Sequence, residues 1–318
     1  MTRTAFVFSG LGPYRVGMAE SLLAHRPGLA ATYFRAADDL LGIPLTRLCR
    51  EGPAHHFADP AVAHPAAFVT GLAALEVLRA EGVRPDIVAG HGLGEYTALV
   101  AAGVLEWPDA LVLVRLHAEL VATAGDRVPG AMAAVEGLDA ATVAQLCAES
   151  TAAGRLVELV CENGPGHTVV SGKAAGVDRL ARAAEAAGAT RTARLPVGGP
   201  FHSSLLGTCV AEFTEALVET EFHDPKVPVV SSVTARPVTS AGRAVVALRD
   251  QLTAPVRWTD TVRRLLALGT RRFVEAGPGP VLDGSIRRLA PGADVQVTGT
   301  VPGLRLALEA AAPAAIPV

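Results

Sequence analysis

The sequence has 318 residues, of which 50% are hydrophobic and 19% charged, with a formal net charge of −3. A chain of this length can bury a sizeable core and is long enough for about two domains. The near-neutral charge, without a basic stripe, excludes a cationic surface for nucleic acid. The four cysteines are widely spaced, which predicts buried reduced thiols in place of a disulfide or metal site.

The beginning of the chain passes directly into a strand-like segment, so we expect no secretory signal peptide. No uninterrupted apolar run reaches the ~20 residues of a membrane span. The sequence therefore predicts a soluble cytoplasmic protein that binds neither membranes nor nucleic acid.

The first part of the chain alternates strands with helices. Two apolar runs that end in glycine turns, residues 5–9 and 86–90, are typical of buried parallel strands. Apolar residues recur at helical spacing in residues 17–24, 30–41, 65–81, 95–102 and 107–123. This alternation predicts an α/β domain with a parallel sheet, like that of hydrolases.

The middle of the chain has the order βαββαβ, which is the ferredoxin-like pattern. The expected strands are residues 130–137, 156–161, 167–171 and 191–197, and the expected helices are 140–150 and 174–187. The α/β character resumes after Pro200, with strands at 227–233 and 272–276 and a glycine–proline turn before the last helix. We therefore predict a discontinuous large domain, residues 1–127 and 199–318, with an inserted small domain, residues 128–198.

The segment AGHGLGEY has the pattern of a nucleophile elbow, in which a buried strand, a tight turn and a helix follow one another directly. The central residue of an elbow is held above the sheet and carries the nucleophile; here it is Gly92. Gly90 and Gly94 keep the spacing. A dinucleotide-binding loop is the alternative, but the third glycine spacing and the later acidic residue are missing.

His202 follows a glycine–proline turn where the small domain returns to the large one. Clefts form at such junctions, and a histidine there can act as a general base. A purely structural histidine is the alternative.

Several segments together resemble the malonyl-CoA:acyl carrier protein transacylase family and the related acyltransferase domains of polyketide synthases. They span nearly the whole chain in order: FVFSGLG, AGHGLGEYTALVAAGVL, LVRLHAEL, CENGPGHTVVSG, PVGGPFHSSL, QLTAPVRW and EAGPG. The resemblance implies acyl transfer in fatty-acid or polyketide biosynthesis. It implies coenzyme A or phosphopantetheine thioesters as substrates, an acyl carrier protein or synthase carrier domain as partner, and no permanently bound cofactor or metal.

The resemblance also implies roles for individual residues. Family members use a serine at the elbow, a histidine as its base and an arginine that pairs with the malonyl carboxylate. By motif, the base is His202 and the carboxylate partner is Arg115, whose guanidinium suits a carboxylate in a dry pocket. The backbone N–H groups of Leu11 and Leu93 would stabilise the oxyanion.

The resemblance further implies substrate-binding roles for His64, His91, Asn163 and Phe201. The bulk of Phe201 resembles malonyl-type more than methylmalonyl-type sites. The backbone carbonyl near Gln251 is expected to orient the base.

The sequence departs from the family pattern at several positions. Gly92 replaces the serine, Leu11 replaces a glutamine, Pro13-Tyr14 replaces the usual Ser-Gln, and His64 stands where glutamine is frequent. Loss of a serine nucleophile typically costs about 10⁶ in kcat.

Three other serines are candidates to replace the missing nucleophile. Ser203 and Ser204 follow the base directly, and adjacent side chains seldom face each other productively. Ser9, at the end of the first strand, is the better candidate for a relocated nucleophile.

Three hypotheses for the function follow. In the first, His202 deprotonates a thiol, amine or water that attacks the acyl thioester directly. In the second, the protein is a catalytically silent scaffold that binds a carrier protein or synthase. In the third, glycine was introduced into an ordinary transacylase. The presence of both His202 and Arg115 favours the first hypothesis.

Overall fold

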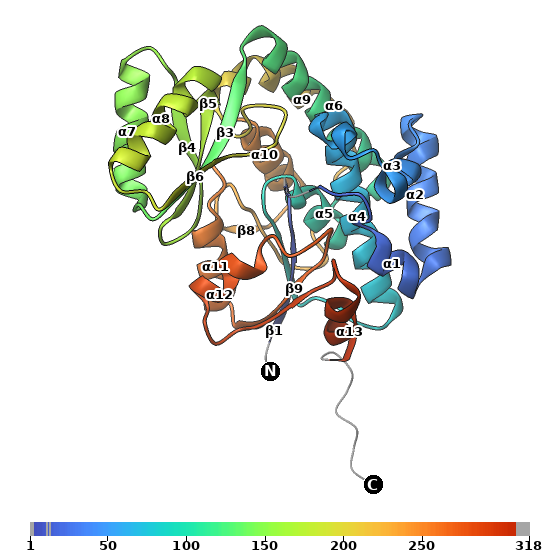
Figure 1. Ribbon diagram of the computed structural model, residues 1–318. Helices are drawn as coiled ribbons and strands as arrows, with labels where there is room; N and C mark the ends of the chain where they lie inside the picture. The colour runs from blue at the N-terminus through green and yellow to red at the C-terminus, as the bar shows by residue number, and fades with distance from the viewer. Residues whose placement is uncertain (1–2, 11, 13, 310–318) are drawn as a thin grey trace.

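The computed structural model describes residues 3–10, 12 and 14–309. These form a large unit around a six-stranded sheet and a small unit around a four-stranded sheet. In Figure 1 the small unit, coloured green to yellow, stands at one side of the large one.

The large sheet has the strand order β10-β9-β1-β2-β7-β8. Its neighbours pair in parallel, except β7 and β8, which are antiparallel. The central strand is almost completely buried at residues 5–8, as expected for a strand with both faces covered. The strands are β1 (Arg3–Phe8), β2 (Ile87–Gly90), β7 (Val229–Val230), β8 (Pro237–Val238), β9 (Thr270–Glu275) and β10 (Asp294–Val297).

Helices surround this sheet (Figure 1). They are α1 (Glu20–His25), α2 (Pro27–Leu41), α3 (Leu45–Glu51), α4 (Pro60–Ala80), α5 (Gly94–Ala101), α6 (Trp107–Arg127), α9 (Val210–Glu219), α10 (Ala241–Gln251), α11 (Trp258–Ala267), α12 (Asp283–Leu289) and α13 (Val301–Glu309). Two short 3₁₀ helices, η1 (Ala54–Ala58) and η2 (Ser204–Cys209), complete the set in the described residues.

Helix α4 begins five residues before its predicted start. The Asp59 side chain accepts a hydrogen bond from the N–H of Ala61, and Pro60 occupies the first helical position, where its missing N–H costs nothing. By length and composition α4 is apolar enough to cross a membrane, although the sequence was predicted to contain no membrane-spanning run. However, 83% of its most apolar window is buried inside the protein, as in the core helix of a soluble domain.

The small unit follows the predicted order of strands and helices. Its antiparallel sheet has the order β4-β5-β3-β6, and its own apolar core includes Val135, Val143, Val170 and Leu180. The elements are β3 (Gly130–Glu136), α7 (Ala140–Ala152), β4 (Val157–Gly164), β5 (His167–Lys173), α8 (Ala174–Ala186) and β6 (Arg191–Arg194). All of them lie within residues 128–198, whose two boundaries stay a prediction.

The later part of the large unit differs from the prediction. The strand expected at 227–233 is reduced to β7. Beyond its C-terminal end, the N–H of Ser232 donates to the Glu95 side chain (3.1 Å) and not to a neighbouring strand. The helix after the turn at Gly277 is α12, and it is not the last, since β10 and α13 follow it.

Candidate active site

The turn between β2 and α5 lies very close to the backbone at the end of β1 and at the start of α5. A Cβ atom on Gly90 would lie 2.1 Å from the backbone nitrogen of Glu95, and one on Gly94 would lie 2.0 Å from the carbonyl oxygen of Phe8. Neither position has room for a side chain. The two outer glycines of the elbow therefore fix its shape.

Gly92, the central residue of the turn, is different. Its φ is +55°, in the left-handed region that glycine adopts without strain. A Cβ atom built on it would point towards His202, at 3.0 Å from the Nε2 atom, and would lie 3.8 Å from Val256 Cγ2. The turn thus has the geometry of a nucleophile elbow whose central position faces a histidine.

A hydrogen bond on the side away from Gly92 fixes the ring of His202. Its Nδ1 atom lies 2.9 Å from the backbone carbonyl oxygen of Gln251, which only accepts hydrogen bonds, so Nδ1 carries the proton and donates it. The unprotonated Nε2 atom then faces Gly92. Burial lowers the pKa of His202 to about 4, although the bond to Gln251 opposes this. The side chain of Gln251 also donates to the carbonyl oxygen of Gly92 (2.9 Å), which ties base and elbow together.

The backbone N–H of Leu93 makes no hydrogen bond to any described part of the chain. It precedes the first residue of α5, where the helix dipole favours negative charge. This N–H is therefore available to an oxyanion. Leu11, the other predicted donor, lies outside the described residues.

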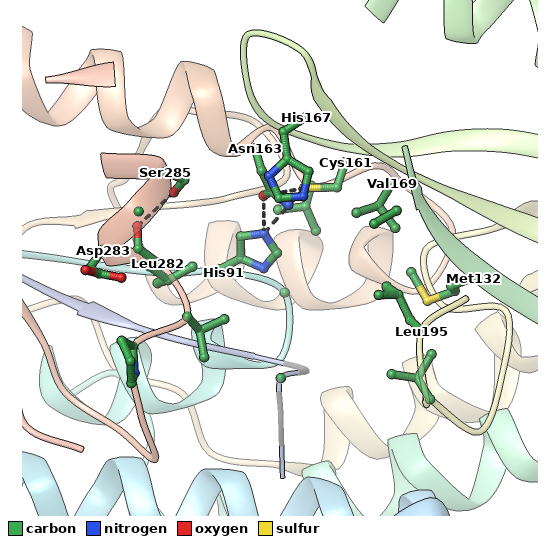
Figure 2. A pocket seen from close by; sticks show the side chains of 18 of the residues that line it. His91, Met132, Cys161, Asn163, His167, Val169, Leu195, Leu282, Asp283 and Ser285 are labelled. Carbon is green, nitrogen blue, oxygen red and sulfur yellow. Dashed lines mark hydrogen bonds between the residues drawn. The ribbon is translucent and has the colours of Figure 1, made fainter. Parts of the chain in front are cut away.

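A cavity of about 530 Å³ opens in front of Gly92 and His202, between the two units. In Figure 2, apolar side chains of the small unit lie on one side of His91 and the segment 282–285 lies on the other. The residues around it are Gly12, His91, Gly92, Met132, Ala134, Cys161, Asn163, His167, Val169, Leu195, Pro196, Val197, His202, Val256, Pro280, Val281, Leu282, Asp283, Gly284, Ser285 and Arg288.

His91 and Asn163 meet in the wall of this cavity (Figure 2). The Nε2 atom of His91 lies 2.9 Å from Asn163 Oδ1, to which it donates, so this atom is not a free base. The thiol of Cys161 lies 3.3 Å from the same nitrogen and 3.0 Å from the same oxygen. The sequence analysis did not identify Cys161 as a cavity residue. Its position two residues before Asn163 on β4 could have indicated it, because side chains two apart on a strand face the same side.

Arg115 does not lie in the site, which corrects its assignment as the carboxylate partner. Its side chain is exposed, bonded to Glu119 (2.7 Å) and to the carbonyl oxygen of Leu41 (2.9 Å). The buried face of α6 instead carries His117, two residues further along. Residues two apart on a helix differ in direction by about 200°, so Arg115 and His117 cannot share a face.

His64 and Phe201 are brought together but lie behind the cavity wall. Both are 1% exposed, and their ring centroids are 5.0 Å apart. The ring of His117 lies 5.6 Å from His64 and 6.1 Å from Phe201. The sequence analysis did not single out His117, although its helical spacing from other apolar residues of α6 placed it on the buried face.

The serines considered as substitute nucleophiles are not in position. Ser9 is buried and does not line the cavity. Ser203 donates its hydroxyl proton to Glu158 (2.6 Å), and Ser204 is exposed. All four cysteines are free and buried, and Cys161 alone among them lines the cavity.

A family model described as acyl transferase domain matches residues 5–310. The chain belongs to this acyltransferase family. It is 39% identical over 289 residues to the malonyl CoA-acyl carrier protein transacylase of Bacillus subtilis, with 91% of each chain covered.

Solved structures agree with this assignment. The malonyl-CoA:acyl carrier protein transacylase of Xanthomonas oryzae superimposes on this acyltransferase with a TM-score of 0.93, at 37% identity, covering 98% of this chain and 100% of that one. A malonyl-transacylase in complex with its type II polyketide synthase acyl carrier protein gives 0.91 at 34% identity, covering 97% and 100%. The resemblance inferred from the motifs and the predicted α/β fold with its smaller antiparallel sheet are confirmed.

Proposed function

We propose that this acyltransferase moves the acyl group of a coenzyme A or phosphopantetheine thioester directly to an acceptor, without an acyl-serine. The acceptor is a thiol, an amine or water. The observation that carries the proposal is the unprotonated Nε2 atom of His202 aimed at the side-chain-free position of Gly92.

In this mechanism the acceptor occupies the space in front of Gly92 and gives its proton to Nε2 of His202 as it attacks the carbonyl carbon. The carbonyl oxygen becomes an oxyanion, which the N–H of Leu93 stabilises. The carbon–sulfur bond then breaks, and the imidazolium returns the proton to the leaving thiolate. Gln251 supports both steps, because its carbonyl holds the proton on Nδ1.

The partner in this proposal is an acyl carrier protein or a synthase carrier domain, and the setting is fatty-acid or polyketide biosynthesis in the cytoplasm. The support comes from the relatives: one is named for the acyl carrier protein, and another was solved bound to one. The apolar wall of the cavity suits a phosphopantetheine arm, which is uncharged between its phosphate and its thioester.

The test combines intact-protein mass spectrometry with thiol release from acetyl- and malonyl-CoA. The variant His202→Asn removes the proposed base. Asparagine is chosen because it tolerates the left-handed backbone (φ 60°) of His202. Turnover without a mass adduct, lost in the variant by roughly 10²–10⁴-fold, is the expected result.

Other outcomes would contradict the proposal. A mass adduct would reveal a relocated nucleophile, and peptide mapping would show whether it is Cys161. Binding of a carrier protein without any turnover would favour a scaffold. Fast malonyl transfer by Gly92→Ser alone, with an inactive parent, would favour a disabled ordinary transacylase.

A further inference from the structure

Three buried histidines lie near one another beside the site; we call His64, His117 and His202 the imidazole cluster. His64 comes from α4, His117 from α6, and His202 from the segment after the small unit. They are 1%, 4% and 8% exposed. Only His202 borders the cavity, so the other two form the layer behind it.

The inner members of the cluster have unsatisfied polar atoms. The Nδ1 atoms of His64 and His117 and the hydroxyl of Tyr96 are buried without a hydrogen-bond partner among the described residues. The ring of Tyr96 stacks on His117 at 6.3 Å. Neutral imidazole and phenol groups can exchange hydrogen bonds with a neutral polar group, but they carry no charge to balance a carboxylate.

The cluster resists protonation. Burial lowers the pKa of His117 to about 3, and it also lowers the pKa of His64; the neighbouring histidines act in the same direction. The buried carboxyl of Glu95 lies beside the same site, bonded to Gln251 Nε2 at 3.3 Å. Burial raises the pKa of Glu95, and any ionised fraction would repel a second carboxylate.

In the described part of the chain, no buried permanent cation supplies the positive charge that these imidazoles lack. Among the residues that the structure describes, no lysine or arginine is buried. Met132, Val169 and Leu195 of the small unit form an apolar part of the cavity wall (Figure 2). Arg288 borders the cavity, but it is exposed, and its guanidinium lies 3.2 Å from Nδ1 of His167.

From this arrangement we infer that the acyl group accepted at Gly92 is uncharged, and that His117 helps to exclude acyl groups that carry a carboxylate. The inference rests on the proposed acyl site at Gly92. A malonyl carboxylate beside Gly92 and the imidazole cluster would be buried without a buried counter-ion, because the arginine of the described lining, Arg288, is exposed. The walls thus select acetyl-like or hydroxyacyl groups over malonyl groups.

The test is a binding measurement, so that it does not depend on turnover. Isothermal titration calorimetry compares coenzyme A, acetyl-CoA, 3-hydroxybutyryl-CoA and malonyl-CoA on the wild-type protein. We expect at least one uncharged acyl-CoA to bind more tightly than coenzyme A. Malonyl-CoA should bind at least about tenfold more weakly than that acyl-CoA.

Two variants locate the effect. His117→Arg places a guanidinium in the inner layer and should shift the preference towards malonyl-CoA by about tenfold or more. The matched control, Arg115→Ala, removes the exposed arginine of the same helix and should leave the preference unchanged. The wild-type comparison decides the inference even if His117→Arg does not fold.

Equal or tighter binding of malonyl-CoA would overturn the inference. So would a set of acyl-CoAs that bind no better than coenzyme A, or a loss of malonyl-CoA binding in Arg115→Ala. If the uncharged preference is found but no thioester is ever consumed, the acyl inference holds and the proposed function fails.

Discussion

The Nε2 atom of His202 lies 3.0 Å from the point at which a Cβ atom on Gly92 would stand. The histidine keeps this position without a nucleophile to hold it, because its anchor is the carbonyl oxygen of Gln251 on the other side of the ring. The base is therefore anchored by a contact that does not involve the side chain of the elbow residue. A side chain added at residue 92 would nevertheless require the ring to shift slightly.

Gly92→Ser should create a covalent acyl-enzyme and lower stability. The new side chain would lie against His202 Nε2, which can take its proton, but a non-glycine residue at φ +55° costs about 1–2 kcal/mol. Mass spectrometry with acetyl-CoA should show the acyl adduct, and urea unfolding should show the lower free energy of unfolding. Gly92→Ala is the matched control, with the same loss of stability and no adduct at residue 92. An equally stable serine variant would contradict the strained geometry.

Thioester hydrolysis should lose activity only in acid. The base acts in its neutral form, and burial lowers the pKa of His202 to about 4, so the rate should fall as the pH drops through about 4. A pH profile of kcat/KM for acetyl-CoA hydrolysis measures this midpoint. A midpoint near the ordinary histidine value would show that the ring is more hydrated than the structure indicates.

His117→Gln should reduce the pH dependence of stability. The folded pKa of His117 is about 3, below its ordinary value of 6.5, so between these values the unfolded chain binds more protons. The free energy of unfolding contributed by His117 is therefore complete above pH 6.5 and declines as the pH falls towards 3. The slope is at most about 1.4 kcal/mol per pH unit. Urea unfolding at several pH values should show a shallower slope in the variant; equal slopes would argue against a buried neutral ring.

Glu275→Gln should destabilise the cavity wall. The two carboxyl oxygens of Glu275 accept hydrogen bonds of 2.8–3.1 Å from the N–H groups of Val281, Leu282 and Asp283. An amide would turn an NH₂ group towards some of these donors and leave them unsatisfied, which costs about 1–3 kcal/mol. Urea unfolding measures the loss. An unchanged midpoint would mean that the segment finds other partners.

The elbow was predictable because its shape is encoded by neighbouring residues. Gly90 and Gly94 stand where backbones touch, and the strand before them and the helix after them have clear periodicity. The ferredoxin-like order was predictable for the same reason. The early end of strand β7 was not predictable, because the N–H of Ser232 just beyond it donates to Glu95, which lies far away in the sequence.

Arg115 shows where motif matching alone fails. The motif supplies the residue types of the segment, whereas the direction of a side chain depends on the helical period. Val114, His117 and Val121 are buried, while Arg115 and Glu119 are exposed on the other face and pair with each other. A check of periodicity would have moved attention from Arg115 to His117. The meeting of His117 with His64 needed the packing of α6 against α4, which no local pattern contains.

One backbone hydrogen bond has a mechanical consequence. The N–H of Val256, in the large unit, donates to the carbonyl oxygen of Val160 (2.8 Å) in the small unit, and Cys161 pairs with Val256 as a parallel bridge. The small unit is thereby fastened to the large one right beside the elbow. The small unit cannot move away from the large unit at this point without breaking this hydrogen bond and bridge. Widening the cavity at this point therefore means giving up this hydrogen bond, which costs about 0.5–1.5 kcal/mol.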